Sequence, residues 1–311
     1  MDSSISLQGA TTSSSNRKHK AADLMNVISS KKIYFTGPYR RQEWSLPDSV
    51  MYYMAMNPKS AEVYQKLVKS CKYFYIKNPI LVVESLIYEK EKWQISCGKE
   101  TIDLVNVTPK FWITDDLDAT HYASVNPNLV SSIIQNIYKC DARLVFLRHQ
   151  VISFDDFCFL ASNIEKFYSY NTIVKDENGS NLAFEKLFQI LSKVQMVNFD
   201  CGTSPSNFTS KSVEELLKIP HFSTLKYLHL NNIPEAFDLD AFYIYMKKNK
   251  VTSFDLNFDS SISEAYKNRL EEIIDEILST KNHDYNPCFI NFSGMIYQKY
   301  LELRRICSSL Y

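Results

Sequence analysis

The chain has 311 residues, a length that suits about two domains, and its 45% hydrophobic content is typical of soluble folded proteins. Its 35 Lys and Arg residues balance 35 Asp and Glu residues, so no overall field favours nucleic acid or an anionic membrane. Residues 1–20 lack the apolar stretch of a signal peptide, and no run of about 18 apolar residues occurs. We therefore expect a cytoplasmic or nuclear protein that neither spans a membrane nor binds nucleic acid.

The residues that commonly carry catalysis or metal binding are not arranged for either. Seven cysteines are scattered, with no C-x-x-C pair and no zinc-like spacing to the six histidines, so we expect reduced structural thiols. Six glycines occur, none of them in a phosphate-binding spacing. The acidic clusters at 115–118 and 155–156 are typical of turns and helix starts. We expect no enzyme activity, no cofactor and no metal.

The first segment of the chain, residues 1–30, is rich in Ser and Thr and poor in large apolar side chains. It cannot bury enough surface to offset the entropy of the chain, so a disordered tail is expected. The basic run at 16–20 is typical of a solvated surface.

Two short helices are predicted between residues 44 and 83. Leu-Pro-Asp at 46–48 fixes an entry turn, and Asn57-Pro58 separates the helices because the residue before Pro avoids helical geometry. The apolar stripe of the first helix consists of Val50, Met51 and Met54. The stripe of the second consists of Val63, Tyr64, Leu67, Val68 and Cys71, and Phe74 closes it.

This arrangement resembles the F-box, whose pattern runs Leu-Pro, an apolar helix, a break with Pro, and a second helix that ends in Cys-Lys-x-Trp or Cys-Lys-x-Phe. The resemblance covers residues 45–83 and departs from the usual pattern at Ser49, at 60–62 and at Phe74. F-boxes dock on a Skp-family adaptor protein, and the resemblance implies that role for Leu46, Pro47, Val50, Met54, Leu67, Val68, Cys71 and Phe74. A generic helical hairpin within a larger domain is the alternative.

A β-rich connecting segment is expected at residues 84–126. The runs ILVVESLIY, KWQIS, TIDLVNV and KFWIT between Ile80 and Asp118 are β-branched or alternating, and turn residues separate them. They predict a small antiparallel sheet or a pair of hairpins.

Helices and short strands alternate from residue 127 to residue 311, as in chains that build a parallel sheet. The predicted helices are 127–139, 153–163, 182–192, 212–219, 238–248, 262–280 and 295–308. Capping boxes are expected at Ser212-x-x-Glu215 and Ser261-x-x-Glu264, and an N-cap is expected at Asp238.

The strands of this region share an LxxLxL spacing of apolar residues. It occurs as Val194, Val197 and Phe199, as Leu225, Leu228 and Leu230, and as Val251, Phe254 and Leu256, with weaker copies at Ala142, Val145 and Leu147 and at Ile164 and Phe167. The central positions recur every 22 to 31 residues, close to the roughly 20–29 of leucine-rich repeats. The region resembles degenerate leucine-rich repeats, so the expected fold is α/β: an F-box-like helical motif, a small β segment and a leucine-rich-repeat-like solenoid.

Such a solenoid buries the LxxLxL positions, covers its convex side with helices and turns the intervening residues outward on a concave sheet. The predicted target-binding residues are Met196, Asn198, Tyr227, His229, Asn231, Ser253, Asp255 and Asn257, with Asp200, Lys166 and Tyr168 on the same face.

The two resemblances together imply a substrate-recognition subunit of an SCF-type ubiquitin ligase, of the divergent type expanded in nematodes, which binds an adaptor and an unknown target protein. The alternative is a repeat scaffold without any ligase connection, whose N-terminal helices cap the solenoid. Packing of Leu46, Pro47 and Met54 against the β segment would favour the scaffold, and an exposed apolar patch would favour the adaptor site.

Overall fold

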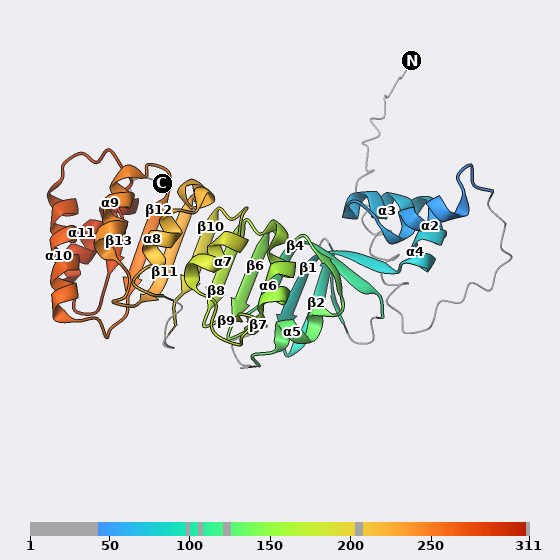
Figure 1. The fold of residues 1–311 in the computed structure, drawn as a ribbon, viewed down its shortest axis with the longest axis horizontal. Coiled ribbons are helices and arrows are strands. Elements are labelled where there is room, and N and C mark those ends of the chain that lie inside the picture. Colours follow the sequence, from blue (N-terminus) through green and yellow to red (C-terminus); the bar gives the residue numbers. More distant parts are fainter. Residues whose placement is uncertain (1–42, 98–99, 105–107, 121–125, 203–207, 309–311) are drawn as a thin grey trace, which may run out of the picture.

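The computed structural model describes residues 43–97, 100–104, 108–120, 126–202 and 208–308. They form a mixed α/β fold in which three short helices adjoin one large, mostly parallel sheet (Figure 1). The predicted tail at 1–30 lies outside the described residues.

The first three helices of the described residues form a small bundle around their own core. They are α2 (Asp48–Met56), α3 (Ala61–Ser70) and α4 (Lys72–Lys77). The predicted second helix is divided at Cys71, which is extended (φ −155°) and whose Sγ accepts a hydrogen bond from the Tyr73 N–H at 3.4 Å. The buried core of the bundle consists of Met51, Ala55 and Phe74.

Eleven strands form the main sheet, in the order β13-β12-β11-β10-β8-β6-β4-β1-β2-β3, and β5 also pairs with β4. The strands are β1 (Ile80–Glu89), β2 (Lys92–Cys97), β3 (Glu100–Asp103), β4 (Lys110–Ala119), β5 (Ile137–Cys140), β6 (Leu144–Arg148), β8 (Lys166–Tyr170), β10 (Met196–Asp200), β11 (Tyr227–Ile233), β12 (Ser253–Phe258) and β13 (Phe289–Asn291). A second, two-stranded sheet pairs β7 (Val151–Ser153) with β9 (Ile173–Lys175). The predicted parallel pairing of β10, β11 and β12 within one sheet is confirmed.

Two predictions, one for the strands between Ile80 and Asp118 and one for the helix at 127–139, are wrong in part. The segment expected to be a small antiparallel sheet is antiparallel only through β1, β2 and β3, because β4 pairs parallel to β1 and joins the main sheet. Phe111, Trp112 and Ile113 of β4 are all buried, as in an inner strand covered on both faces. The helix expected at 127–139 ends at Ile134, because residues 137–140 pair with β4 as strand β5.

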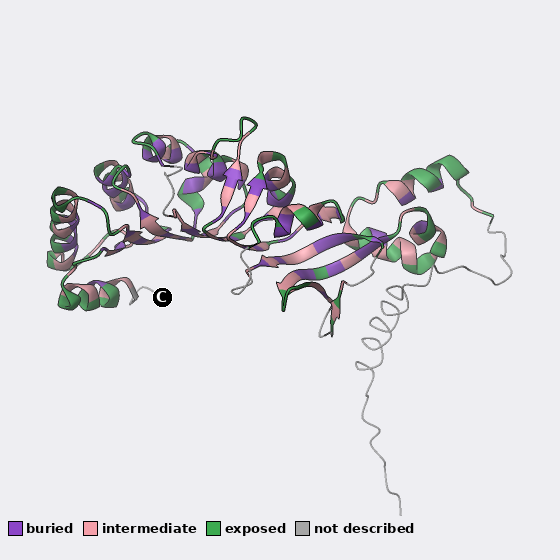
Figure 2. Cartoon of the chain, turned by 90° about the horizontal axis from the view of Figure 1, so that it is seen from below, coloured by how far each residue is buried: buried purple, intermediate pink, exposed green. Residues whose placement is uncertain are grey.

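The remaining helices lie between the strands, except for one that follows the last strand, and the other six predicted helical ranges each contain one. These helices are α5 (Leu129–Ile134), α6 (Phe154–Leu160), η1 (Ala161–Asn163), α7 (Phe184–Ile190), α8 (Ser212–Leu217), η2 (Pro220–Thr224), α9 (Leu239–Lys248), α10 (Glu264–Ser279) and α11 (Tyr297–Ser308). Figure 2 shows the helices that follow the parallel strands gathered on one side of the sheet, while the C-terminal helix lies on the other side. We call this other side the open face.

The LxxLxL positions point into the core on the helix-covered side, with one exception. Leu225, Leu228 and Leu230 have no exposed surface (0%), whereas Val251 is 59% exposed. Thr252 takes the buried position instead, and its Oγ1 donates a hydrogen bond to the Leu225 carbonyl at 2.8 Å. The buried position before β12 therefore lies one residue later than the spacing predicts, while β12 itself stays in register with β11.

The bundle is joined to the sheet through a second small core of Tyr64, Ile80 and Trp112. The Tyr64 hydroxyl donates to the Asn78 carbonyl at 2.6 Å and accepts from the Ile80 N–H at 3.1 Å. Tyr138 donates from its hydroxyl to the Met56 carbonyl at 3.3 Å. These contacts fix the bundle to the start of β1.

Candidate functional site

The first candidate surface lies on the bundle, at the turn before α2 and along the outer side of this helix. Leu46 is 46% exposed, Val50 is 39% exposed and Tyr53 is 67% exposed. Val50 and Tyr53 lie three residues apart and therefore share one side of α2, while Leu46 lies in the turn that precedes the helix. We call Leu46, Pro47, Val50 and Tyr53 the bundle surface.

The turn that carries the bundle surface is held from both sides. The Pro47 carbonyl accepts hydrogen bonds from the N–H groups of Val50 at 2.9 Å and Met51 at 3.1 Å, which starts the helix. Trp44 packs on the inner side, with its ring centroid 6.2 Å from that of Phe74. The exposed apolar side chains are therefore presented by an ordered turn.

The eight residues predicted to bind an adaptor differ in exposure. Leu46, Pro47 and Val50 are exposed; Met54, Leu67, Val68 and Cys71 are half-buried; and Phe74 is 2% exposed. Met54 packs against the core of the bundle and not against the β segment. Tyr53 was missed by the sequence analysis, although its helical spacing from Leu46 and Val50 could have found it.

The second candidate surface is the open face, where the predicted target-binding residues lie together. The parallel register aligns them in rows across β10, β11 and β12. The first row is Met196, Tyr227 and Ser253, and the second is Asn198, His229 and Asp255. Asp200 and Asn231 form the next pair, and Asn257 follows Asp255 on β12 beyond a register irregularity between β11 and β12. All of them are half-buried, because neighbouring side chains shield one another on a flat sheet.

His229 and Asp255 form an ion pair at the centre of this surface. His229 Nδ1 lies 3.1 Å from Asp255 Oδ2 and 3.3 Å from the Tyr227 hydroxyl. Burial of the imidazole lowers the pKa of His229, but the hydrogen bond and charge of Asp255 raise it, with smaller contributions from Asn231 and Asp200. The net result is a pKa above the ordinary value of 6.5.

The His229–Asp255 pair predicts a pH-dependent stability. A raised folded-state pKa means that the pair stabilises the fold fully below the unfolded pKa near 6.5, and that this contribution is lost as pH rises through the folded-state pKa. We expect the free energy of unfolding of the wild type to exceed that of His229→Gln most at about pH 5.5 and least at about pH 8.5. Urea unfolding followed by circular dichroism measures it, and a difference that does not shrink with rising pH would contradict the prediction.

The open face continues onto β8, β6 and β4, where it becomes aromatic and acidic. The rings of Phe146 and Tyr168 are stacked, with centroids 4.2 Å apart and planes 17° from parallel. Asp118 of β4 is in register with Phe146, and Asp116 lies two residues before Asp118 on the same strand. Burial raises the pKa of Asp116, the Ser85 hydrogen bond lowers it, and the net pKa lies above the ordinary value. Of these residues, the sequence analysis placed only Tyr168 on this face.

Helix α11 closes the open face at β13. Phe289 is in register with Asp255 and therefore lies on the open face. Its ring centroid lies 5.3 Å from that of Tyr300 and 5.4 Å from the Arg304 guanidinium. Leu303, which lies between these two residues in the sequence, has no exposed surface (0%). The exposed part of the open face therefore extends from β4 to β12.

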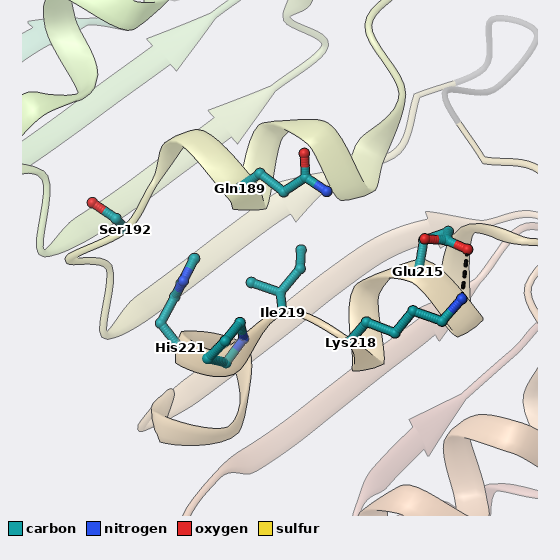
Figure 3. A pocket seen from close by; sticks show the side chains of 7 residues that line it. Gln189, Ser192, Glu215, Lys218, Ile219 and His221 are labelled. Carbon is teal, nitrogen blue, oxygen red and sulfur yellow. Dashed lines mark hydrogen bonds and ion pairs between the residues drawn. The ribbon is translucent and has the colours of Figure 1, made fainter.

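A hollow of about 350 Å³ opens on the helix-covered side, between α7 and the segment from α8 to η2 (Figure 3). Three of its polar side chains have partners within the protein, because Lys218 Nζ lies 2.8 Å from Glu215 Oε1 and His221 Nε2 lies 2.6 Å from the Phe188 carbonyl oxygen. It is lined by Gln189, Ser192, Glu215, Lys218, Ile219, Pro220 and His221. This arrangement favours no particular class of ligand.

Among the described residues, no three or more His, Cys, Asp or Glu side chains are grouped to hold a metal ion. Burial raises the pKa of the Cys140 thiol to about 11 and raises that of the Cys288 thiol well above its ordinary value, so these thiols are protonated at neutral pH. Every helix in the described part of the chain is too short or too polar to cross a membrane.

Comparison with known proteins identifies no family. No protein-family model matches the chain, and no curated protein matches it in sequence.

Proposed function

We propose that the protein is the substrate-recognition subunit of an SCF-type ubiquitin ligase. The bundle surface binds a Skp-family adaptor, and the open face of a leucine-rich-repeat-like sheet holds a target protein. The chain positions the target for a separate enzyme and does no chemistry itself.

The exposure of the bundle surface is the observation that supports this proposal most. Large apolar side chains at an ordered turn, such as Leu46 at 46% and Tyr53 at 67% exposure, are typical of a surface that a partner covers. They occur at the Leu-Pro turn and first helix of a sequence that resembles the F-box. This is the outcome that favours an adaptor site over packing within the chain.

A repeat scaffold without a ligase connection is the second candidate. It would use the helices as an end cap, but the sheet edge on the bundle side is completed by the antiparallel strands β2 and β3. Tyr64 of the bundle instead packs with Ile80 at the start of β1 and with Trp112 of β4. This position supports a binding role for the helices over a capping role.

Titration of a purified Skp-family adaptor tests the proposal. Burying one large aliphatic side chain contributes roughly 1.5–3 kcal/mol, so Leu46→Ala combined with Pro47→Ala should weaken the complex at least about tenfold. Both positions are exposed, so circular dichroism should find the fold unchanged.

The matched control is Ile244→Ala in α9, which removes an apolar side chain of similar exposure, 57%, at the far end of the molecule. It should leave adaptor binding unchanged. If the wild type does not bind, or the doubly substituted protein binds equally well, the ligase proposal falls and the scaffold is the better account.

A further inference from the structure

The open face over β4, β6 and β8 carries a flat aromatic surface next to two carboxylates. Asp118, Phe146 and Tyr168 are aligned in one row by the parallel register, and the two stacked rings span two strands. Asp116 lies two residues before Asp118 and therefore on the same side of β4. We call Asp116, Asp118, Phe146 and Tyr168 the acidic–aromatic strip.

The two carboxylates are held by neutral donors. Asp118 Oδ1 accepts hydrogen bonds from the Thr120 N–H at 2.9 Å and its hydroxyl at 2.6 Å, and Asp116 Oδ2 accepts from the Ser85 hydroxyl at 3.2 Å. Within the described ranges neither of them forms an ion pair, whereas the neighbouring Asp115 pairs with Arg143. The strip therefore keeps a local negative charge.

A cation suits the rings as well as the carboxylates. Lysine and arginine bind the face of an aromatic ring within about 6 Å, and their aliphatic stems cover apolar surface. The same two strands already hold one such contact, because the Arg148 guanidinium lies 5.0 Å from the centroid of Tyr170. Arg148 and Lys166 lie on β6 and β8, so the favourable place for an incoming cation is on the β4 side.

The net charge of residues 43–311 also favours a basic partner. Residues 1–42 hold seven of the 35 basic and two of the 35 acidic residues. Residues 43–311 therefore hold 28 basic and 33 acidic residues, a net charge of −5. Such a surface attracts basic segments over a distance that salt shortens.

We propose that the acidic–aromatic strip binds an extended basic segment of the target, with an arginine or lysine side chain lying over Phe146 and Tyr168 and its charge at Asp116 and Asp118. This inference rests on the proposed role of the open face in target binding. Alternate residues of an extended segment lie about 6.8 Å apart on one side, the spacing expected for Asp116 and Asp118 along β4. A segment with two basic residues two positions apart therefore matches both carboxylates.

The test is a titration of a fluorescein-labelled peptide, GSRLRFSG, against the full chain by fluorescence anisotropy, with GSELEFSG as the control peptide. Asp116→Asn with Asp118→Asn should weaken binding of the basic peptide at least about tenfold. The amides keep the oxygen acceptors for Ser85 and Thr120, so the fold should be retained. Tyr168→Leu should weaken binding about threefold or more.

The matched control is Glu177→Gln, which removes one exposed carboxylate away from the open face and should leave binding unchanged. Equal binding of both peptides, or equal binding by the wild type and the double amide variant, would overturn the inference. Binding only after Arg17, Lys18 and Lys20 are replaced by Ser would also overturn it, because residues 1–42 would then be the occupant.

Adaptor titration on the same preparations separates this inference from the proposed function. The strip is distinct from the bundle surface, so the double amide variant should bind the adaptor as the wild type does. If the adaptor binds and the peptide does not, the inference fails while the ligase proposal stands. If the peptide binds with the expected loss in the double amide variant and the adaptor does not bind, the inference stands and the ligase proposal fails.

Discussion

Replacement of Trp112 by Ala is expected to destabilise the protein by about 3–5 kcal/mol, because the largest fully buried side chain would leave a cavity that its neighbours cannot close. Trp112 has no exposed surface (0%) and touches Tyr64 and Ile80, where the bundle meets the sheet. Its Nε1 also donates to Asp141 Oδ2 at 2.7 Å. Urea unfolding followed by far-ultraviolet circular dichroism measures the change.

Trp112→Phe is the control for this substitution, because it keeps an aromatic ring at the joint and loses only the hydrogen bond and part of the volume. Asp141 keeps its bonds to Lys139 at 3.2 Å and to Asn163 at 2.7 Å, so no carboxylate is left without a partner. We expect a loss less than half of that for Trp112→Ala. Equal losses for the two variants would show that ring volume at this joint is not what stabilises it.

Met51→Asp is expected to unfold the bundle while the sheet stays folded. Met51 is 4% exposed in the core of the bundle, and a carboxylate buried there without a cation costs at least about 3 kcal/mol. The core that joins the bundle to the sheet does not include Met51. Amide hydrogen exchange should therefore lose protection over residues 48–77 and keep it in β10, β11 and β12.

The control is Val50→Asp, one residue earlier, where the side chain is 39% exposed. This variant should keep the protection of the bundle and still weaken adaptor binding, because a charge would then lie in the apolar bundle surface. Loss of protection throughout the chain in Met51→Asp would mean that the bundle and the sheet unfold as one unit.

The sheet could be predicted from sequence where apolar spacing alone determines which residues are buried. Leu225, Leu228 and Leu230 are such a case, and so is the N-cap at Asp238, whose carboxylate accepts from the Ala241 N–H at 3.0 Å. Prediction failed where a polar network replaced an apolar side chain. Thr252 is buried because its hydroxyl binds the Leu225 carbonyl, a contact 27 residues away that no local pattern reveals.

The two predicted capping boxes also show the limits of local patterns. Ser261 lies three residues before Glu264, but the N-cap of α10 is Ser263, whose Oγ accepts from the Tyr266 N–H at 3.2 Å. Ser212 lies inside α8, and its Oγ accepts from the Thr209 N–H at 2.9 Å. A spacing of three residues identifies the neighbourhood of a helix start but not the residue that caps it.

The candidate surfaces could be predicted only in part, because the residues that lie together depend on which strands pair and in which direction. The residues on β10, β11 and β12 were placed together correctly because one repeated spacing aligns them. The acidic–aromatic strip was missed because Asp118 and Phe146 come together only when β4 and β6 are parallel. The sequence pattern instead predicts an antiparallel arrangement for the segment that contains β4.

The continuous hydrogen bonding of the main sheet makes it a spacer of fixed length. From β1 to β13 the order passes through seven strand-to-strand steps, and at about 4.8 Å each they separate the two ends by roughly 34 Å. Backbone hydrogen bonds join each strand to the next along this path, so a partner bound near β12 is held at a set distance from a partner bound to the bundle. Gain or loss of one strand with its helix would change the distance between the two ends of the sheet by about 5 Å. In chains of this architecture the number of strands therefore sets the distance between two bound partners.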